Sequence, residues 1–229
     1  MQQPFYNHPK HFLSVDCVIF GYRESELHLL LYNRNFEPLK GQWSLMGGFV
    51  QESETVEEAA GRILYQITGL KDIYLDQVQV FSKSDRDPGA RVVSIANYAL
   101  IRMDFNDKDL WNDHGAVWWP IQQLPELIFD HRDMVTAALE KLQHKANYTL
   151  IGQELLPEQF TIIQLRSLYE AIFQCSLDSG NFRKRILSLK VLERLDNKDK
   201  TGSKKGAYYY KYKTNDATAK VDRIVRLIL

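Results

Sequence analysis

A glycine pair followed by a long amphipathic segment, GGFVQESETVEEAAGRILYQITGL at residues 47–70, constrains the fold more than any other feature of this sequence. Two acidic residues, Glu57 and Glu58, fall in the first turns of the segment, where acids suit a helix dipole. Apolar residues then recur at the i, i+3 and i+4 spacing of one helix face: Val56, Ala59, Ala60, Ile63, Leu64 and Ile67. The segment therefore predicts a glycine loop leading into a helix that packs on a core.

The overall composition is typical of a soluble globular protein. Hydrophobic residues make up 45% and charged residues 25% of the chain, and the longest apolar runs, such as LHLLLY at 27–32, are too short to cross a bilayer. The first twenty residues lack a signal-peptide core. Cys17 and Cys175 lie in different halves, which favours two buried, reduced thiols over a disulfide framework or a metal cluster. We therefore expect a cytoplasmic protein without a membrane partner, a cofactor or a bound metal.

The charge of the chain is divided unevenly although its net value is zero. Residues 150–229 contain 15 Lys and Arg against 9 Asp and Glu, so the front half carries the matching acidic excess. A split of this kind points to a nucleic-acid-binding rear half, although a solvated basic surface is the alternative.

The front half alternates segments of strand and helix character. Segments rich in branched and aromatic residues predict strands at 12–22, 27–34, 74–84, 91–102 and 116–121. The short RESE stretch between the first two predicts a hairpin, and residues 131–146 predict a helix. The expected domain, residues 1–150, is thus a mixed sheet with helices packed on it.

The pattern changes beyond a boundary near 145–158. Thr161, with Gln164 three residues later, forms a capping-box signature before an apolar helical segment. Asp178 or Ser179 can cap a second helix at 180–189, and strands are expected at 190–195 and 207–213. Residues 151–229 therefore predict two helices followed by a hairpin with a long basic tip.

The spacing around the glycine pair resembles a Nudix box. The frame is carried by Gly48, Glu54, Arg62, Gly69 and Leu70. A Nudix box continues after its arginine with Glu-x-x-Glu-Glu on one helix face, and these carboxylates hold Mg²⁺. This chain has Ile63, Gln66 and Ile67 at those positions. Because the metal neutralises phosphate charge and activates water, their loss predicts that the protein is not an enzyme.

Taken with the basic rear half, the degenerate box makes the chain resemble the Nudix-related transcriptional regulator family, and most closely its arabinose-responsive members. The segments that carry the resemblance are 34–38, 43–51, 85–100, 124–131, 181–185 and 202–207. It implies a Nudix-like α/β/α sandwich with a mixed sheet, an effector-binding and dimerisation domain, followed by a winged helix-turn-helix domain. It also implies a homodimer that binds double-stranded operator DNA and releases it when a sugar, L-arabinose, binds.

The second helix and the hairpin tip hold the candidate DNA contacts, since arginine can pair with guanine and asparagine with adenine in the major groove. The predicted DNA-binding residues are Asn181, Arg183, Lys184, Arg185, Lys200, Ser203, Lys204 and Lys205. Taken singly, each lysine is as well explained by a solvated surface.

The resemblance also implies an effector pocket where a Nudix substrate would lie. A sugar needs hydrogen-bonding groups and an aromatic wall. The candidates are Arg34, Phe36, Trp43, Phe49, Asp85, Arg86, Asp87, Arg91, Asp130 and His131. Ordinary turn chemistry explains Asp85 and Asp87 equally well, and a helix start explains Asp130 and His131. ADP-ribose is the rival effector, and its pyrophosphate would be bound by the arginines of this set rather than by its acids.

Three functions remain open at the level of sequence: a sugar-responsive regulator, an active Nudix hydrolase acting on ADP-ribose or a related molecule with an appended nucleic-acid-binding domain, and a DNA-binding protein with a vestigial sensor. The residues at 63, 66 and 67 separate the first from the second. Nothing in the sequence separates the first from the third.

Overall fold

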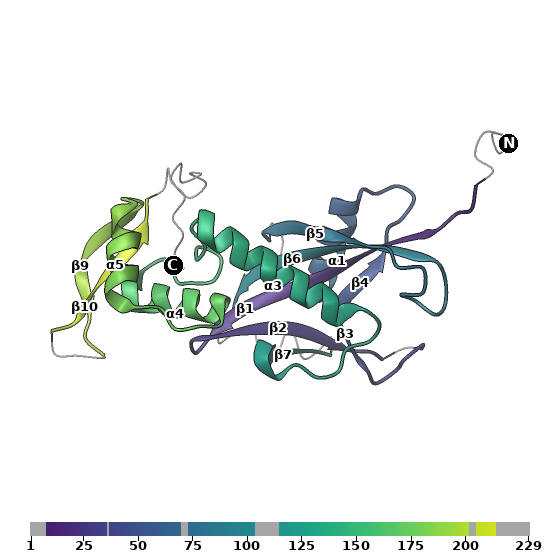
Figure 1. The fold of residues 1–229 in the computed structure, drawn as a ribbon, viewed down its shortest axis with the longest axis horizontal. Coiled ribbons are helices and arrows are strands. Elements are labelled where there is room, and N and C mark those ends of the chain that lie inside the picture. Colours follow the sequence, from purple (N-terminus) through teal and green to yellow (C-terminus); the bar gives the residue numbers. More distant parts are fainter. Residues whose placement is uncertain (1–7, 36, 70–72, 104–114, 202–204, 214–229) are drawn as a thin grey trace.

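A mixed sheet forms the front half of the protein (Figure 1). The computed structural model describes residues 8–35, 37–69, 73–103, 115–201 and 205–213. The strands of this sheet are β1 (Phe12–Arg23), β2 (Glu26–Asn33), β3 (Trp43–Ser44), β4 (Met46–Phe49), β5 (Leu75–Phe81), β6 (Val92–Arg102) and β7 (Ala116–Pro120). A short 3₁₀ turn, η2 (Ile121–Gln123), follows β7. All five strands predicted from the sequence are present, and the mixed sheet is confirmed.

Strand β1 organises the sheet because it pairs along both edges. It runs parallel to β6 from Phe12↔Val92 to Tyr22↔Arg102. Its other edge is shared, with residues 14–17 paired antiparallel to β4 and residues 19–23 paired antiparallel to β2. The glycine pair lies on β4, so this pairing brings it directly beside the first residues of β1.

One helix packs on each face of the sheet. Helix α1 (Val56–Thr68) begins at a complete Thr55–Glu58 capping box and ends at Gly69, whose φ of 65° suits glycine. Its apolar face includes Ala59, Ala60, Ile63 and Leu64, which are buried against β1 and β4. Helix α3 (His131–Tyr148) covers the opposite face with Met134, Val135, Ala138 and Leu142. The predicted α/β/α sandwich is therefore confirmed.

The rear half is a small winged-helix unit. Helix α4 (Ile162–Phe173) begins at the predicted Thr161–Gln164 capping box, and α5 (Ser179–Ser188) begins at Asp178, whose side chain accepts a hydrogen bond from the Asn181 N–H. Strands β9 (Leu192–Asp199) and β10 (Ala207–Tyr212) form the expected hairpin. A two-residue strand that the sequence analysis missed, β8 (Phe160–Thr161), pairs with β10.

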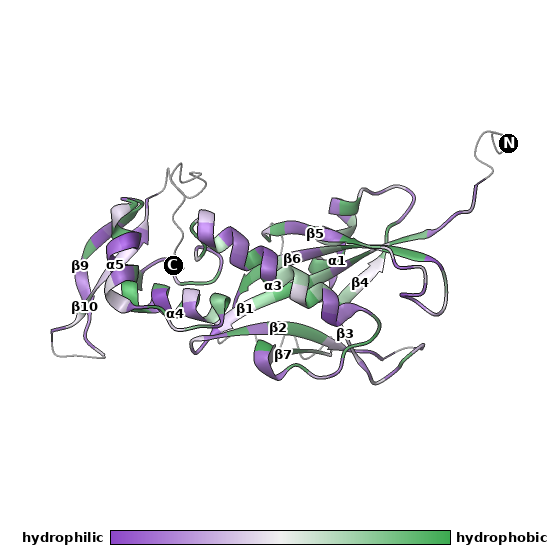
Figure 2. Cartoon of the chain, in the orientation of Figure 1, coloured by the Kyte–Doolittle hydropathy of each residue, from purple (hydrophilic) through white to green (hydrophobic). Residues whose placement is uncertain are grey.

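The two halves share one apolar core. A single cluster of buried residues runs from Phe20 and Leu29 in the sheet, through α3, to Leu165 and Phe182 in the winged helix. The connecting stretch is part of it: Ile151 is buried, and its N–H donates to the Tyr169 hydroxyl at 3.1 Å. Hydropathy colouring shows apolar stretches along β1 and the middle of β2, and a mixture of hydrophilic and apolar residues in α5 and the hairpin (Figure 2).

Both cysteines are free, and one prediction about them is wrong. Cys17 is buried in the sheet, as expected, but Cys175 is exposed because it lies in the turn after α4. Among the described residues, no helix has the length and apolar character needed to span a membrane.

Candidate functional site

A cavity of about 780 Å³ opens above the sheet at the N-terminal end of α3. Its walls come from the start of β1, the loop after β2, strand β4, the 86–87 turn and the first residue of α3. Five of the predicted effector residues line it: Arg34, Phe49, Arg86, Asp87 and His131. Segments up to about 120 residues apart in the sequence thus meet around one cavity. The volume of this cavity lies within the range of about 300–1,000 Å³ that is typical of small-molecule sites.

Asp16, which the sequence analysis missed, lies at the base of this cavity. Its carboxylate accepts a 2.5 Å hydrogen bond from the Ser94 hydroxyl and lies 3.7 Å from His131 Nε2. A Cβ at Gly47 would lie 2.1 Å from the Asp16 carboxylate oxygen, so only glycine fits there. The signal available in the sequence was a single acid within the apolar strand FLSVDCVIF.

Arg86 is the main cation beside Asp16. Its side chain is 3% exposed and donates to both carboxylate oxygens of Asp130, at 2.9 and 2.7 Å. The same guanidinium lies 3.9 Å from Asp16. Asp130 precedes α3 but makes no side-chain capping hydrogen bond. Its role here is therefore to pair with Arg86 rather than to cap the helix.

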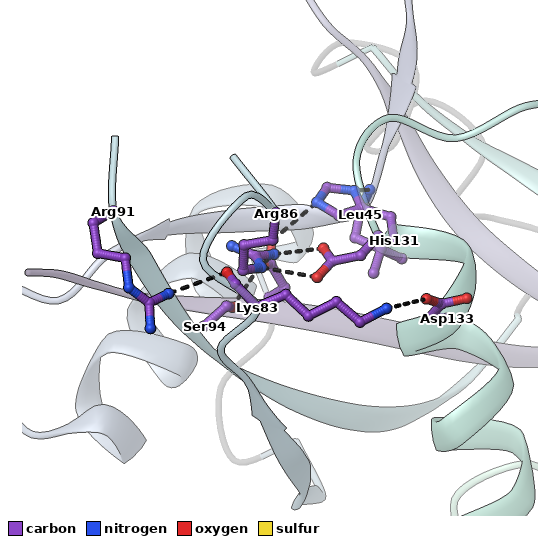
Figure 3. Close-up of polar contacts among 9 residues, drawn as sticks. Leu45, Lys83, Arg86, Arg91, Ser94, His131 and Asp133 are labelled. Carbon is purple, nitrogen blue, oxygen red and sulfur yellow. Dashed lines mark hydrogen bonds and ion pairs between the residues drawn. The ribbon is translucent and has the colours of Figure 1, made fainter. Parts of the chain in front are cut away.

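His131 connects the cavity to α3. Its Nδ1 accepts a hydrogen bond from the Leu45 N–H at 3.0 Å, so the proton of the neutral ring is carried by Nε2, on the side of Asp16 (Figure 3). Burial lowers the pKa of His131, and the nearby carboxylates of Asp16 and Asp130 only partly oppose this effect. A neutral histidine therefore presents an N–H donor to the buried carboxylate.

Several of the predicted effector residues are engaged in contacts of their own or lie away from the cavity. Arg91 donates to the Lys83 carbonyl at 3.1 Å (Figure 3). Asp85 is exposed, and neither residue lines the cavity. Trp43 packs edge-on against Trp119 with ring centroids 5.4 Å apart. Within the cavity wall, Asp87 accepts from the Gly89 N–H in an ordinary turn, and Arg34 donates to the Pro38 carbonyl. Phe36 lies outside the described residues.

Among the described residues, the segment that carries the Nudix frame offers no group of side chains that could hold Mg²⁺. Ile63 is buried, and its Cδ1 lies 3.1 Å from where a Cβ of Gly48 would be. The carboxylate of Glu54 is held by Arg62 through two hydrogen bonds of 2.9 and 2.6 Å, which lower its pKa. Gln66 is exposed, and the side chain of Ile67 lies outside the described set. An apolar group and a paired carboxylate cannot supply the oxygen ligands that Mg²⁺ requires.

Helix α5 presents a basic, solvent-exposed face. Asn181, Arg183 and Lys184 are exposed and Arg185 is half-buried. Phe182 and Ile186, on the other face, are buried in the common core. This is the arrangement expected of a recognition helix, which turns its polar face toward solvent and its apolar face toward the core.

The β9–β10 hairpin adds a second basic surface. Lys200 and Lys205 are exposed near its tip, and Gly206 has a φ of 67°. Behind the tip, the Lys198 ammonium and the Arg194 guanidinium lie 4.2 and 4.6 Å from the centre of the Tyr208 ring. Ser203 and Lys204, also predicted to contact DNA, lie outside the described residues.

A Nudix fold with the buried Ile63 on its frame helix, joined to a winged helix with a basic exposed face, defines the class as Nudix-related DNA-binding regulators. Two family models match the chain: the NUDIX domain over residues 10–138 and the NrtR DNA-binding winged helix domain over residues 152–212. The chain belongs to the NrtR-type, Nudix-related transcriptional regulators.

Three relatives illustrate the similarity. A protein of Acinetobacter baylyi described as an ADPR responsive transcriptional repressor is 30% identical over 214 residues, which cover 92% of this chain and 85% of the relative. Shewanella oneidensis NrtR complexed with a 27mer DNA has a TM-score of 0.76 at 28% identity, covering 90% of this chain and 95% of that one. The NUDIX domain of the Shewanella protein complexed with ADP ribose has a TM-score of 0.50 at 26% identity, covering 62% and 94%.

These relatives correct the finer part of the sequence-based resemblance. The regulator family is confirmed, but the expected kinship with arabinose-responsive members is not supported, because the similar proteins are of the NrtR type. The sequence predicts that the polar residues at 85–87 and 130–131 form hydrogen bonds with the hydroxyls of a sugar. In the structure, Asp130 instead neutralises Arg86, and Asp87 closes a turn.

Proposed function

We propose that this protein is a transcriptional repressor that binds operator DNA through its winged helix and releases it when ADP-ribose, or a closely similar nucleoside diphosphate sugar, occupies the cavity of its Nudix domain. The cavity carries this proposal. At about 780 Å³ it suits a nucleotide-sized molecule, whereas a pentose would leave most of it empty. The Acinetobacter relative and the ADP-ribose-bound Shewanella domain support the same ligand class.

The side chains around the cavity also suit a ligand that carries negative charge. Arg34 lines it and can face a pyrophosphate without a metal, and Arg86 adds a second cation whose charge is shared with Asp130. The acids that would be needed for a neutral sugar are largely engaged, since Asp16 accepts from Ser94 and Asp130 is paired with Arg86. L-Arabinose, the effector expected from the sequence, therefore serves as the comparison ligand.

The central experiment is a titration of the protein–operator complex. By linkage, a ligand that lowers operator affinity must have its own affinity lowered by the same factor, typically about 5- to 150-fold. We expect ADP-ribose to release the DNA and L-arabinose to have no effect. Release by L-arabinose and not by ADP-ribose would reverse the effector assignment, and no response to either ligand would favour a vestigial sensor.

The DNA-binding assignment is tested by two kinds of substitution. Arg183→Ala, in the exposed face of α5, should cost about 1–3 kcal/mol and relax discrimination at one base pair. Lys205→Ala, near the hairpin tip, should weaken binding to all sequences alike and reduce the log–log salt slope by about 0.9. Unchanged operator affinity in both variants would contradict the assignment. Sedimentation of the free protein tests the accompanying proposal that it acts as a homodimer on paired half-sites.

We also propose that the protein does not hydrolyse nucleoside diphosphate derivatives. The support is the buried Ile63 on α1, at a position where a metal-binding carboxylate would be needed, and Glu54, which lies just before the helix and is held by Arg62. ADP-ribose should be recovered intact after incubation with Mg²⁺ or Mn²⁺. Turnover near ordinary enzyme values, on the order of 1 s⁻¹ or more, would establish the hydrolase alternative.

A further inference from the structure

Two neighbouring aromatic rings are exposed to solvent, and one of them, Phe49, lines the cavity. Phe12 and Phe49 are 57% and 55% exposed, and their ring centroids are 5.3 Å apart with the planes tilted by 46°. Phe49 pairs with Ser14 across the β1–β4 ladder and lines the cavity itself. Neighbouring apolar rings that are this exposed to solvent are typical of a surface that contacts a ligand or a partner.

The position of Phe49 is fixed by residues that remain from the Nudix frame. Arg62 donates from Nη2 to the Phe49 carbonyl at 3.1 Å, and the same guanidinium holds Glu54 through two hydrogen bonds. Glu54 in turn accepts from the Gln51 N–H at 2.8 Å. The Arg62–Glu54 pair therefore holds the backbone at the end of β4, where Phe49 lies, a structural role that needs no metal.

The cavity has two chemically different ends. Asp16, Arg86 and His131 make one part polar and charged, whereas Phe49 and Met46 contribute an apolar wall that continues to Phe12. A ligand that spans both ends needs a charged or hydroxyl-rich part and a flat apolar part. A nucleoside diphosphate sugar has this division, with the base as its flat part.

We propose that Phe49, supported by Phe12, is the surface on which the base of the effector stacks. This inference rests on the proposed function, because it assigns one part of the same ligand. Stacking of a base on an aromatic side chain contributes enough that removal of the ring lowers affinity about tenfold or more. The polar end of the cavity then binds the sugar and the pyrophosphate. The aromatic end binds the base, so that a nucleotide is bound more tightly than a sugar phosphate that lacks a base.

The test is calorimetric titration of the full chain with ADP-ribose. Phe49→Leu should weaken binding about tenfold, and Phe49→Tyr, which keeps the ring, should bind within about twofold of the unchanged protein. Tyr148→Leu removes an exposed ring at the far end of α3 and serves as the matched control, with no expected effect. Proton NMR gives an independent readout, because a base stacked on a ring shows upfield shifts of its H2 and H8 resonances, and Phe49→Leu should abolish them.

The outcomes separate this inference from the proposed function. If the unchanged protein binds ADP-ribose and Phe49→Leu alters neither the affinity nor the base resonances, the stacking assignment is wrong while the effector assignment stands. If Phe49→Leu instead changes only the monomer–dimer equilibrium in sedimentation, the rings belong to an interface between two copies, which also overturns the inference. Failure of the unchanged protein to bind ADP-ribose would overturn both.

Discussion

Replacement of Arg86 by methionine should be among the most damaging single changes in the Nudix domain. The guanidinium is 3% exposed, and its partners Asp16 and Asp130 each have a side chain that is 10% exposed. Arg86→Met keeps much of the apolar stem but leaves two buried carboxylates without their cation. Breaking a buried pair from one side costs about 3–5 kcal/mol, which for a chain of this size corresponds to a fall in Tm on the order of 10 °C.

The same loop and helix provide a matched control. Lys83 also faces an acid of α3, Asp133, but at 3.9 Å and with side chains that are 76% and 64% exposed (Figure 3). Lys83→Met should therefore leave urea unfolding nearly unchanged, as is usual for surface pairs. A double variant that adds Asp130→Asn to Arg86→Met should be less destabilised than the sum of the single changes, because one buried charge is removed with its partner. A loss below about 1 kcal/mol for Arg86→Met would refute the argument.

Two further predictions follow from the same cluster. Gly47→Ala should cost about 1–3 kcal/mol or more in urea unfolding, because its Cβ would lie 2.1 Å from an Asp16 carboxylate oxygen and 2.9 Å from the Val15 carbonyl; a neutral effect would show that this approach is not tight. Burial lowers the pKa of His131 in the folded protein, so the unfolded chain takes up the proton first and stability should fall as pH drops from about 7 to 5. His131→Asn should flatten part of that slope, and the remainder should respond to His28→Asn, since burial also lowers the pKa of His28; an unchanged slope in the double variant would contradict both assignments.

The parts of the fold that local chemistry determines could be predicted from the sequence. The Thr161–Gln164 capping box gave the start of α4, and alternation of apolar residues gave the strands of the sheet. The short strand β8 was missed because two residues carry no periodicity, and its pairing with β10 is decided by tertiary contacts.

The site was predicted only as a set of residue types. Arg86, Asp130 and His131 were expected to contact a ligand, but the sequence could not show that Arg86 and Asp130 neutralise each other across 44 positions. Asp16 was missed because its importance depends on the parallel pairing of β1 with β6, which brings Ser94 beside it. Trp43 was expected in the wall, yet aromatic character alone cannot distinguish a ligand surface from packing against Trp119.

The apolar core that runs from the sheet into the winged helix limits how this architecture can be recombined. A chimera that joins this sensor to another winged helix at residue 150 would cut between α3 and a connecting stretch whose Ile151 is buried and hydrogen-bonded to Tyr169. The foreign helix would have to match the surface of α3, including Gln143, which donates to the Ile172 carbonyl of α4 at 3.0 Å. Exchange of operator specificity between relatives is therefore better attempted by grafting the exposed residues of α5 alone, which leaves the shared interior of the two halves intact.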